Sequence, residues 1–290
     1  MTALASPAEL VVPRSRSRVW AKFRRNRSAL LGAAFVAFFV AVAIAAPLLS
    51  PFDPTRTDWL AVRKAPSALY WLGTDEIGRD ILSRMLWGAR ASLMAGVVSV
   101  SIAVALGVPF GLLAGYAGGW IDGVISRATE ALLACPFLIL AIALAAFLSP
   151  SLTNAMLAIG LSAMPIFIRL TRGQVLAVKT EDYVEGARAI GMPHVWIVLR
   201  YILPNVFAPI LVQSTLAIAT AIIAEASLSF LGLGQQPPAP SWGSMLNVAK
   251  NFLEQAPWMA LWPGAAIFLV VLGFNLLGDG LRDALDPREL

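Results

Sequence analysis

The sequence predicts an all-α, polytopic membrane protein with six transmembrane helices. Of its 290 residues, 58% are hydrophobic and only 13% are charged, and the mean hydropathy is +0.75. A soluble domain carries about a quarter charged residues. This composition excludes a disordered chain, which needs low hydrophobicity and high charge. It also argues against a soluble globular enzyme, because so few charges would not cover its surface.

Five uncharged runs are long enough to span a bilayer, since a helix needs about 20 apolar residues to cross the hydrocarbon core. The run from Ala131 to Ile168 is too long for one crossing, and Ser149-Pro150-Ser151 with Asn154 divides it in two. The expected helices cover residues 29–49, 91–116, 126–148, 153–175, 205–231 and 258–278. We therefore divide the chain into a basic tail at 1–28 and a six-span domain at 29–290.

The distribution of basic residues predicts the orientation. Six crossings put both termini on one side, and 15 of the 22 basic residues fall on that side. Seven of them lie between Arg14 and Arg27, a stretch without acidic residues. The positive-inside rule then makes both termini cytoplasmic. The segments at 50–90 and 233–257 are external, and the segment at 177–204 is cytoplasmic.

Lipid is the expected partner of the basic tail. Trp20 and Phe23 lie among its basic residues and suit an amphipathic helix on an anionic bilayer surface. We disfavour nucleic acid as the partner, because the inner leaflet would occupy this face.

The chain offers no catalytic or metal-ligating constellation. It has one cysteine, Cys135, and one histidine, His194, so neither an internal disulfide nor a Cys/His metal site is expected. A phosphate-binding loop needs a glycine-rich turn followed by Lys, and no Gly precedes a Lys anywhere. If transport uses ATP, the ATPase is a separate polypeptide.

The cytoplasmic segment at 177–204 is the most informative stretch. It reads as a short capped helix, a turn and a second helix: Asp182 and Glu185 have capping-box spacing, Gly191 suits the position after the helix end, and Pro193 suits the start of the next helix. Tyr183, Ala187 and Ile190 are expected to share one face. Two interpretations stay open: an ordinary interfacial helix, or a rigid lever that a cytoplasmic partner pushes and that moves the next span through Pro204.

Polar residues within the spans are candidates for a translocation path or for helix packing. Glu225 is the clearest intramembrane charge, and such a group marks either a functional site or a structural partner near the external interface. Gln213 and Ser214 on the same helix are weaker candidates for the path. Gly107, Gly111 and Gly115 recur every four residues, which favours close helix packing over a sliding surface.

One spacing carries a family resemblance. Glu185-Gly186-Ala187, Gly191 after three intervening residues, and Leu203-Pro204 resemble the "EAA" loop of ATP-binding-cassette (ABC) importer permeases, whose pattern is E-A-A, three residues, G, nine residues, I-x-L-P. Gly186 replaces the first Ala, and Tyr201 replaces the Ile. Further segments are similar to the C-type permease subunit of the dipeptide/oligopeptide/nickel importers, from about residue 22 to the end. They lie at residues 71–93, 115–122, 230–246 and 274–287.

The resemblance implies an architecture and a set of partners. It implies a type I ABC importer permease in a bacterial inner membrane, completed by a homologous permease subunit, two cytoplasmic ATPases that bind ATP and Mg, and an extracytoplasmic binding protein. This chain would hold no cofactor of its own. The residues implied for coupling to an ATPase are Glu185, Gly186, Ala187, Gly191, Leu203 and Pro204.

The external loops are the expected docking surface for the binding protein. Asp75, Arg79 and Asp80 in the first loop read as a charged surface, and Trp242 lies in the second. The alternative is a solvated loop with local salt bridges. The expected function is import of di- or oligopeptides by alternating access, with a nickel chelate or glutathione as the alternative cargo. Less favoured are an ion-coupled secondary transporter, a membrane enzyme and an exporter.

Overall fold

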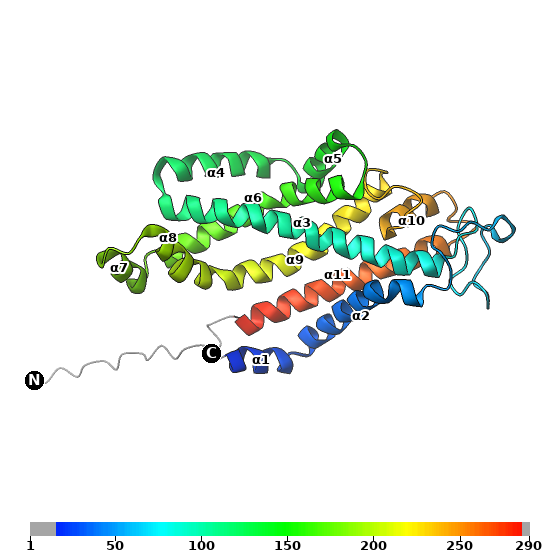
Figure 1. Cartoon of the computed structure of the whole chain (residues 1–290), viewed down its shortest axis with the longest axis horizontal. Coiled ribbons are helices and arrows are strands. Elements are labelled where there is room, and N and C mark those ends of the chain that lie inside the picture. The colour runs from blue at the N-terminus through cyan, green and yellow to red at the C-terminus, as the bar shows by residue number, and fades with distance from the viewer. Residues whose placement is uncertain (1–15, 286–290) are drawn as a thin grey trace, which may run out of the picture.

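The computed structural model describes residues 16–285 as a bundle of helices (Figure 1). Within this part of the chain the only β-type pairing is an isolated bridge between Thr74 and Asp80. Five helical stretches are long and apolar enough to cross a membrane, and a bent helix pair makes a sixth candidate. The all-α, six-span prediction is therefore confirmed at the level of the fold. The tail residues before Arg16, Arg14 among them, lie outside the described residues.

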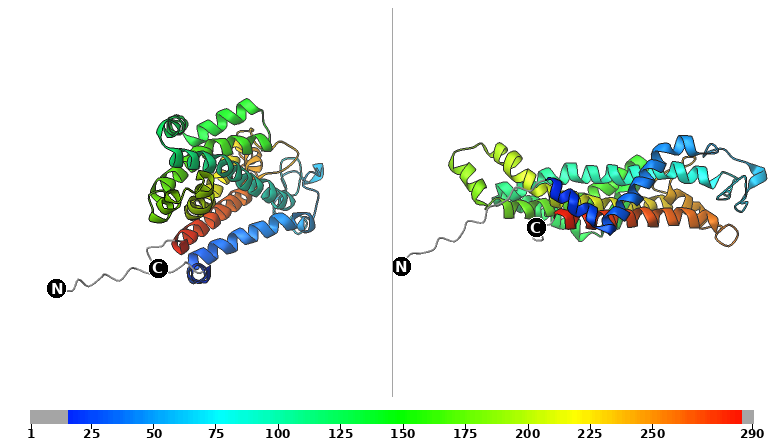
Figure 2. Two further views of the ribbon diagram at one scale, coloured as in Figure 1. Left: turned by 60° about the vertical axis from the view of Figure 1, so that its left-hand side comes forward. Right: turned by 90° about the horizontal axis from the view of Figure 1, so that it is seen from below.

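The five long stretches run side by side along the bundle (Figures 1 and 2). They are α2 (Arg27–Leu49), α3 (Ile81–Ala117), α6 (Leu152–Val178), the continuous run of α8 (His194–Ile197), η2 (Val198–Ile202) and α9 (Leu203–Phe230), and α11 (Trp258–Leu285). Each contains a proline within its helix: Pro47, Pro109, Pro165, Pro209 and Pro263, in chain order. α3 packs most extensively against α6, and α11 lies against α2 and α9.

The third expected span is not one helix. Instead of a straight helix at 126–148, the chain forms α4 (Gly119–Ala134) and α5 (Phe137–Leu148), which meet at an angle of 91°. Pro136 lies at the break and lacks the N–H that would continue the helix, and it forces Cys135 before it into an extended conformation. Hydropathy correctly indicates enough apolar residues for a span here, but it carries no information about the bend between α4 and α5.

The external segment at 50–90 is shorter than expected. α3 begins at Ile81, ten residues before the predicted start, and Asp80 caps it by accepting a hydrogen bond of 2.7 Å from the Ser83 N–H. The prediction ended the helix at charged residues, but Arg84 is buried in the first turns of α3. The other external segment, at 233–257, contains a further short helix, α10 (Trp242–Ala249).

Glycines allow the close contact between α3 and α6. A Cβ atom added at Gly107, Gly111 or Gly115 would lie 2.6–2.7 Å from the Cβ of Phe167, Thr171 or Val175, respectively, on α6. Real Cβ atoms do not approach so closely, so only glycine permits this helix separation. This confirms the packing interpretation of the four-residue spacing.

The two ends of the bundle differ in character. The short helices α1 (Arg16–Arg25) and α7 (Asp182–Ala189) and the end of α11 lie toward one end, while α10 and the loop before α3 lie at the other (Figure 1). Phe23 of α1 packs against Ala29 and Ala284, and Trp20 is 60% exposed and stacks on Phe23. α1 is therefore anchored to the bundle through one apolar face and presents Trp20 to its surroundings.

Candidate coupling helix and transport site

The short helix α7 lies at one end of the bundle, and its C-terminal end is well defined. Gly191 adopts a φ of +75°, a conformation that favours glycine. The Gly191 N–H donates to the Arg188 carbonyl (2.9 Å), and the Met192 N–H donates to the Ala187 carbonyl (3.1 Å). These two bonds form a Schellman motif. The predicted helix end at Gly191 is confirmed.

The start and the buried face of α7 differ from the prediction. The N-cap is Glu181, which makes no side-chain capping bond, so Asp182 does not open a capping box. Asp182 and Glu185 lie in the first turn, where negative charge suits the helix dipole. Val184 and Ala187 form the buried face, whereas Ile190 is 78% exposed, so the expected face of Tyr183, Ala187 and Ile190 is wrong. The contacts of α7 with α8 and η2, which follow it in the chain, determine which of its faces is buried.

The outward surface of α7 is open. Glu185 and Gly186 are exposed, and no atom lies within 4 Å of a Cβ placed at Gly186 or Gly191. On the inner side, Val184 and Ala187 share an apolar cluster with Ile197, Ile202 and Val206. A partner seated on the outer surface would thus press on a helix that packs against α8 and η2, which continue directly into α9.

The junction between α7 and α9 contains a π-helical turn. η2 spans Val198–Ile202, and the Leu203 N–H donates to the Val198 carbonyl five residues earlier. Such turns are uncommon and are found mostly at functional positions. Leu203 is half-buried at the start of α9, and Pro204 is exposed beside it. The structure therefore joins the candidate coupling residues to α9 by continuous helix.

Glu225 of α9 lies inside the bundle, fully buried. Its carboxylate accepts hydrogen bonds from Ser229 Oγ (2.7 Å) and from Ser92 Oγ of α3 (3.1 Å). Ser92 Oγ in turn accepts the Trp242 N–H at 3.3 Å, which brings in α10. Glu225 thus joins three helices, and these contacts favour the structural interpretation that the sequence left open. Its role in a translocation path stays a prediction.

Substitutions at Glu225 separate these roles. Glu225→Leu removes the acceptor of two buried hydroxyls, each worth about 1–3 kcal/mol, so we expect a marked loss of protein that remains monodisperse after heating in detergent. Glu225→Gln retains an acceptor oxygen, and we expect near-normal stability and transport. A Leu variant as stable as the Gln variant would contradict the structural role, and loss of transport in a stable Gln variant would favour a functional one.

The other two path candidates lie apart from Glu225. Gln213 and Ser214 are half-buried on α9, and Ser214 Oγ donates to the Ile210 carbonyl of its own helix at 2.7 Å. Twelve residues of helix separate Gln213 from Glu225, about 18 Å along the axis. The three predicted residues therefore do not form one cluster.

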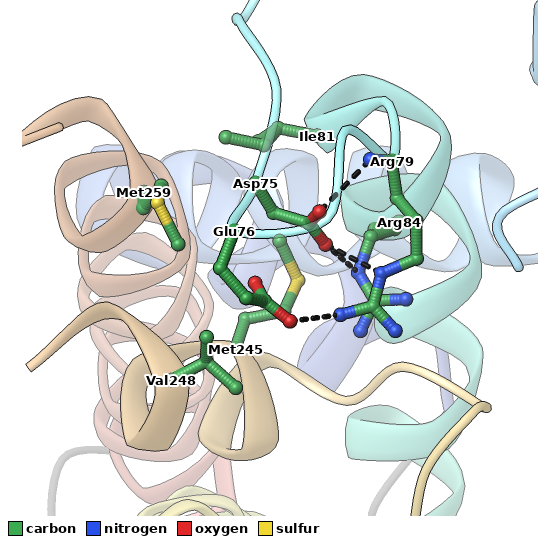
Figure 3. Close-up of a pocket in the computed structure, with 8 residues that line it drawn as sticks. All are labelled: Asp75, Glu76, Arg79, Ile81, Arg84, Met245, Val248 and Met259. Carbon is green, nitrogen blue, oxygen red and sulfur yellow. Dashed lines mark hydrogen bonds and ion pairs between the residues drawn. The ribbon is translucent and has the colours of Figure 1, made fainter. Parts of the chain in front are cut away.

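Four charged residues at the end of the first external loop and the start of α3, Asp75, Glu76, Arg79 and Arg84, form one cluster (Figure 3). Arg79 contacts Asp75 (Nε–Oδ2, 2.6 Å) and Glu76 (Nη2–Oε1, 2.6 Å), while Arg84 lies 3.4 Å from Asp75. Asp75, Arg79, Asp80 and Arg84 are each at most 6% exposed. The expected charged surface is wrong: these side chains neutralise one another inside the loop, which a linear reading of charge does not reveal.

This cluster ties the external loops together. Arg84 Nη1 donates to the carbonyls of Pro54 (3.0 Å) and Pro238 (3.3 Å), which belong to different loops. Met245 of α10 and Met259 of α11 close its apolar side (Figure 3). Trp242 is also buried: its indole N–H donates to the Met85 carbonyl (3.1 Å), and its ring meets Phe39 edge-on. The four residues predicted for docking instead shape the loops from within.

Docking by these loops would fall to other side chains. Trp59, Leu60 and Trp71 of the first loop are 72%, 87% and 68% exposed, and Leu253 of the second is 52% exposed. The prediction from sequence did not include them, although two tryptophans in a polar loop were a usable signal. Large exposed apolar side chains are enriched where proteins bind partners.

The partial burial of the Glu76 carboxyl predicts that the stability of the folded protein depends on pH. Burial raises the pKa of its carboxyl above the ordinary 4.5, and the charge of Asp75 raises it further, against the opposing effect of Arg79. The folded state therefore binds this proton more tightly than the unfolded state. Its contribution to stability is complete below pH 4.5 and is lost as the pH rises through the raised pKa.

The measurement is the unfolding midpoint in detergent over a pH series that starts below the ordinary pKa of 4.5 and rises past neutral pH. We expect the midpoint of the wild-type protein to fall with rising pH relative to that of Glu76→Gln. Glu254→Gln, at an exposed acidic residue of the other external loop, is the matched control and should show no such trend. Parallel curves for wild type and Glu76→Gln would contradict the burial argument.

Comparison with known proteins shows what this arrangement belongs to. The sequence pattern of the binding-protein-dependent transport system inner membrane component family matches residues 107–290. The N-terminal transmembrane domain of oligopeptide transport permease C matches residues 16–66. The chain belongs to this family of transport permeases.

Relatives of the permease match over almost the whole chain. The dipeptide transport system permease protein DppC of Alkalihalophilus pseudofirmus is 47% identical over 92% of this chain and 88% of its own. DppC of Haemophilus influenzae is 43% identical over 93% of each. The glutathione transport system permease protein GsiD of Escherichia coli O157:H7 is 48% identical over 93% of this chain and 89% of its own. The predicted C-type permease of an ABC importer is thereby confirmed.

Solved structures show the same fold for the permease. An inward-facing MetNI methionine ABC transporter matches with a TM-score of 0.59 at 21% identity, over 71% of this chain and 98% of the other. An amino acid ABC transporter matches with a TM-score of 0.53 at 19% identity, over 68% and 92%. The permease is a multi-pass inner-membrane subunit of an ABC importer, which sets aside the secondary transporter.

Proposed function

We propose that the permease imports di- or oligopeptides by alternating access, driven by a separate ATPase that grips α7. One observation carries this proposal: α7 exposes Glu185 and Gly186 outward, while its other face packs on α8 and η2, the start of the continuous run that becomes α9. A helix too short to fold alone needs tertiary contacts, and these contacts make it a rigid knob on a span. The family supports an ATPase partner, since a permease of an ABC importer works with one.

Each coupling residue has a distinct part in this mechanism. Glu185 and Gly186 offer the contact surface, and Gly191 ends the helix sharply enough to keep it short. Ala187 faces the apolar cluster with Val184. Leu203 and Pro204 begin α9 directly after the π-helical turn. A push on the outer surface of α7 is thus delivered to one end of a membrane-spanning helix.

We propose that both termini are cytoplasmic, on the side of α7. α1 lies at that end and bears Arg24 and Arg25 beside exposed Trp20, a combination that suits the anionic inner leaflet. The further partners in this proposal are a homologous permease, a second ATPase and an extracytoplasmic binding protein. ATP and Mg would be bound by the ATPases, and this chain would act as a transport subunit without enzymatic activity.

Peptides are the proposed cargo because relatives of similar identity are named for dipeptides and for glutathione. The two cargo classes share amide bonds and ionised ends, so one path can serve either chemistry. A nickel chelate is the remaining alternative within the family to which the permease is similar. Gln213, Ser214 and Glu225 stay the proposed polar residues of the path.

Reconstitution tests the proposal. The permease is expressed together with a homologous permease, ATPases and a binding protein from the same genome, purified through a tag on this chain and placed in proteoliposomes. We expect an ATPase to co-purify and labelled alanyl-alanine to accumulate only with ATP, with glutathione and nickel as competitors to rank cargo. Uptake by the purified chain alone, or cross-links from α7 that reach only lipid, would overturn it.

A further inference from the structure

Tyr116, near the end of α3 on the side of α7, contacts two other segments at once. Its hydroxyl shares a hydrogen bond of 2.7 Å with Nδ1 of His194, the first residue of α8, and the two rings meet at 5.7 Å. The guanidinium carbon of Arg188, in the last turn of α7, lies 5.3 Å from the centre of the Tyr116 ring. One aromatic side chain of α3 therefore touches both helices of the candidate coupling segment.

A second contact reinforces this connection next to Tyr116. Lys179, which directly follows α6 and precedes α7, donates from Nζ to the Gly115 carbonyl at 2.8 Å. The last carbonyls of a helix have no partner within it, so a lysine at this position both satisfies one of them and favours the negative end of the helix dipole. The end of α3 is thus held by polar contacts from both sides of α7.

The apolar face of α7 points to a different part of the bundle. Through Val184 and Ala187 it packs on α8 and η2, which continue into α9. Without Tyr116, a displacement of α7 would reach α9 through α8 and η2, and the Lys179–Gly115 bond before α7 would be the remaining polar contact described above between this segment and α3. With Tyr116, the same displacement pulls on α3 directly, because a cation over an aromatic face and a hydrogen bond both resist separation.

We propose that Tyr116 is a positioning residue that transmits the movement of α7 to α3, in parallel with the route through Pro204 into α9. This inference rests on the proposed function, since it takes an ATPase to move α7. α3 in turn is seated on α6 through the glycine contacts at Gly107 and Gly111. The relay therefore shifts α3 and α6 as a pair, so that ATP moves two sides of the bundle together.

The test measures distances in the assembled complex by spin labelling, with native Cys135 replaced by Ser. One label pair joins α2 and α3 (Leu48→Cys with Leu113→Cys), and a reference pair joins α2 and α9 (Leu48→Cys with Phe207→Cys). All three side chains are between 48% and 90% exposed in this chain. Each pair is measured without nucleotide and with ATP, in a complex whose ATPase cannot hydrolyse it.

We expect ATP to change both distances in the otherwise wild-type permease. In Tyr116→Leu and in Arg188→Gln, the α2–α3 change should be lost while the α2–α9 change remains. Tyr116→Phe keeps the ring under Arg188 and should lose part of the change, and Arg188→Lys, which preserves the cation, should restore it. Arg127→Gln, in an exposed ion pair on α4, is the matched control and should leave both changes intact.

The relay would be overturned if the α2–α3 distance did not respond to ATP in the wild-type permease, or if its change persisted in Tyr116→Leu. It would also be overturned if Tyr116→Leu lost both distance changes together, because Tyr116 would then act only in maintaining the fold. Failure of the proposed function looks different. In that case no ATPase assembles with the permease, or the reference α2–α9 distance also ignores ATP in wild type, and the relay falls with it.

Discussion

Glu185→Arg is expected to abolish ATP-driven uptake while leaving the permease folded and inserted. Glu185 is exposed on α7, so its replacement disturbs no buried contact. The fold loses only the favourable placement of an acid near the helix N-terminus, about 0.3–1 kcal/mol. At a docked surface, by contrast, reversing a charge costs several kcal/mol through like-charge contact, which corresponds to a loss of uptake of about 100-fold or more.

Three measurements on one preparation check this expectation: uptake into proteoliposomes, the amount of ATPase that co-purifies, and the amount of permease in the membrane. Asp279→Arg is the matched control, because Asp279 is also an exposed acid and lies in the last turns of α11, at the same end of the bundle. Glu185→Arg should lose uptake and ATPase together, and the control should lose neither. Normal uptake in Glu185→Arg would remove the lever role from α7.

Gly111→Leu is expected to prevent stable folding of the bundle. A Cβ at this position would lie 2.6 Å from Thr171 Cβ and 2.8 Å from the Ile168 carbonyl oxygen on α6. A backbone carbonyl does not move aside as a flexible side chain does, so α3 and α6 must separate. Overpacking of this kind costs about 1–3 kcal/mol or more, and here it acts on the most extensive helix contact of the fold.

The chain offers a matched control for this substitution. Gly123 of α4 is exposed, and a Cβ at this position would have no atom within 4 Å, so Gly123→Leu adds the same side chain where there is room for it. We expect Gly111→Leu to give little monodisperse protein in size-exclusion chromatography and Gly123→Leu to behave as wild type. Equal yields of the two variants would mean that the α3–α6 separation is not fixed by its glycines.

The spans were predictable because a bilayer imposes a simple requirement, about 20 apolar residues for each crossing. The break between α4 and α5 was missed because Pro136 lies inside an uninterrupted apolar run, where hydropathy counts residues and ignores direction. The early start of α3 was missed because its first turns contain charged residues, which are usually exposed. A charged residue such as Arg84 predicts exposure from sequence, but its partners, Asp75 and the carbonyls of Pro54 and Pro238, allow it to be buried.

In the coupling segment, too, features set by neighbouring residues were predictable, whereas features set by contacts with other helices were not. The end of α7 was predictable because Gly191 acts on its immediate neighbours. Its buried face was not, because Val184 and Ala187 are covered by Ile197 and Ile202, and no pattern within α7 reports on those contacts. The cluster at Asp75 is the extreme case, since the charges there become compatible with burial only once the chain has brought them together.

The interior prolines of α3, α6 and α9 bear on how such a bundle changes shape. Pro109, Pro165 and Pro209 have no N–H, so the carbonyls of Ala105, Leu161 and Asn205 lack their usual intrahelical partner in any conformation. Bending a helix at one of these prolines therefore does not break the backbone hydrogen bond that this position would otherwise form. Three neighbouring spans thus contain positions at which bending costs little, and we expect the permease to change conformation by bending there rather than by unfolding helix inside the lipid.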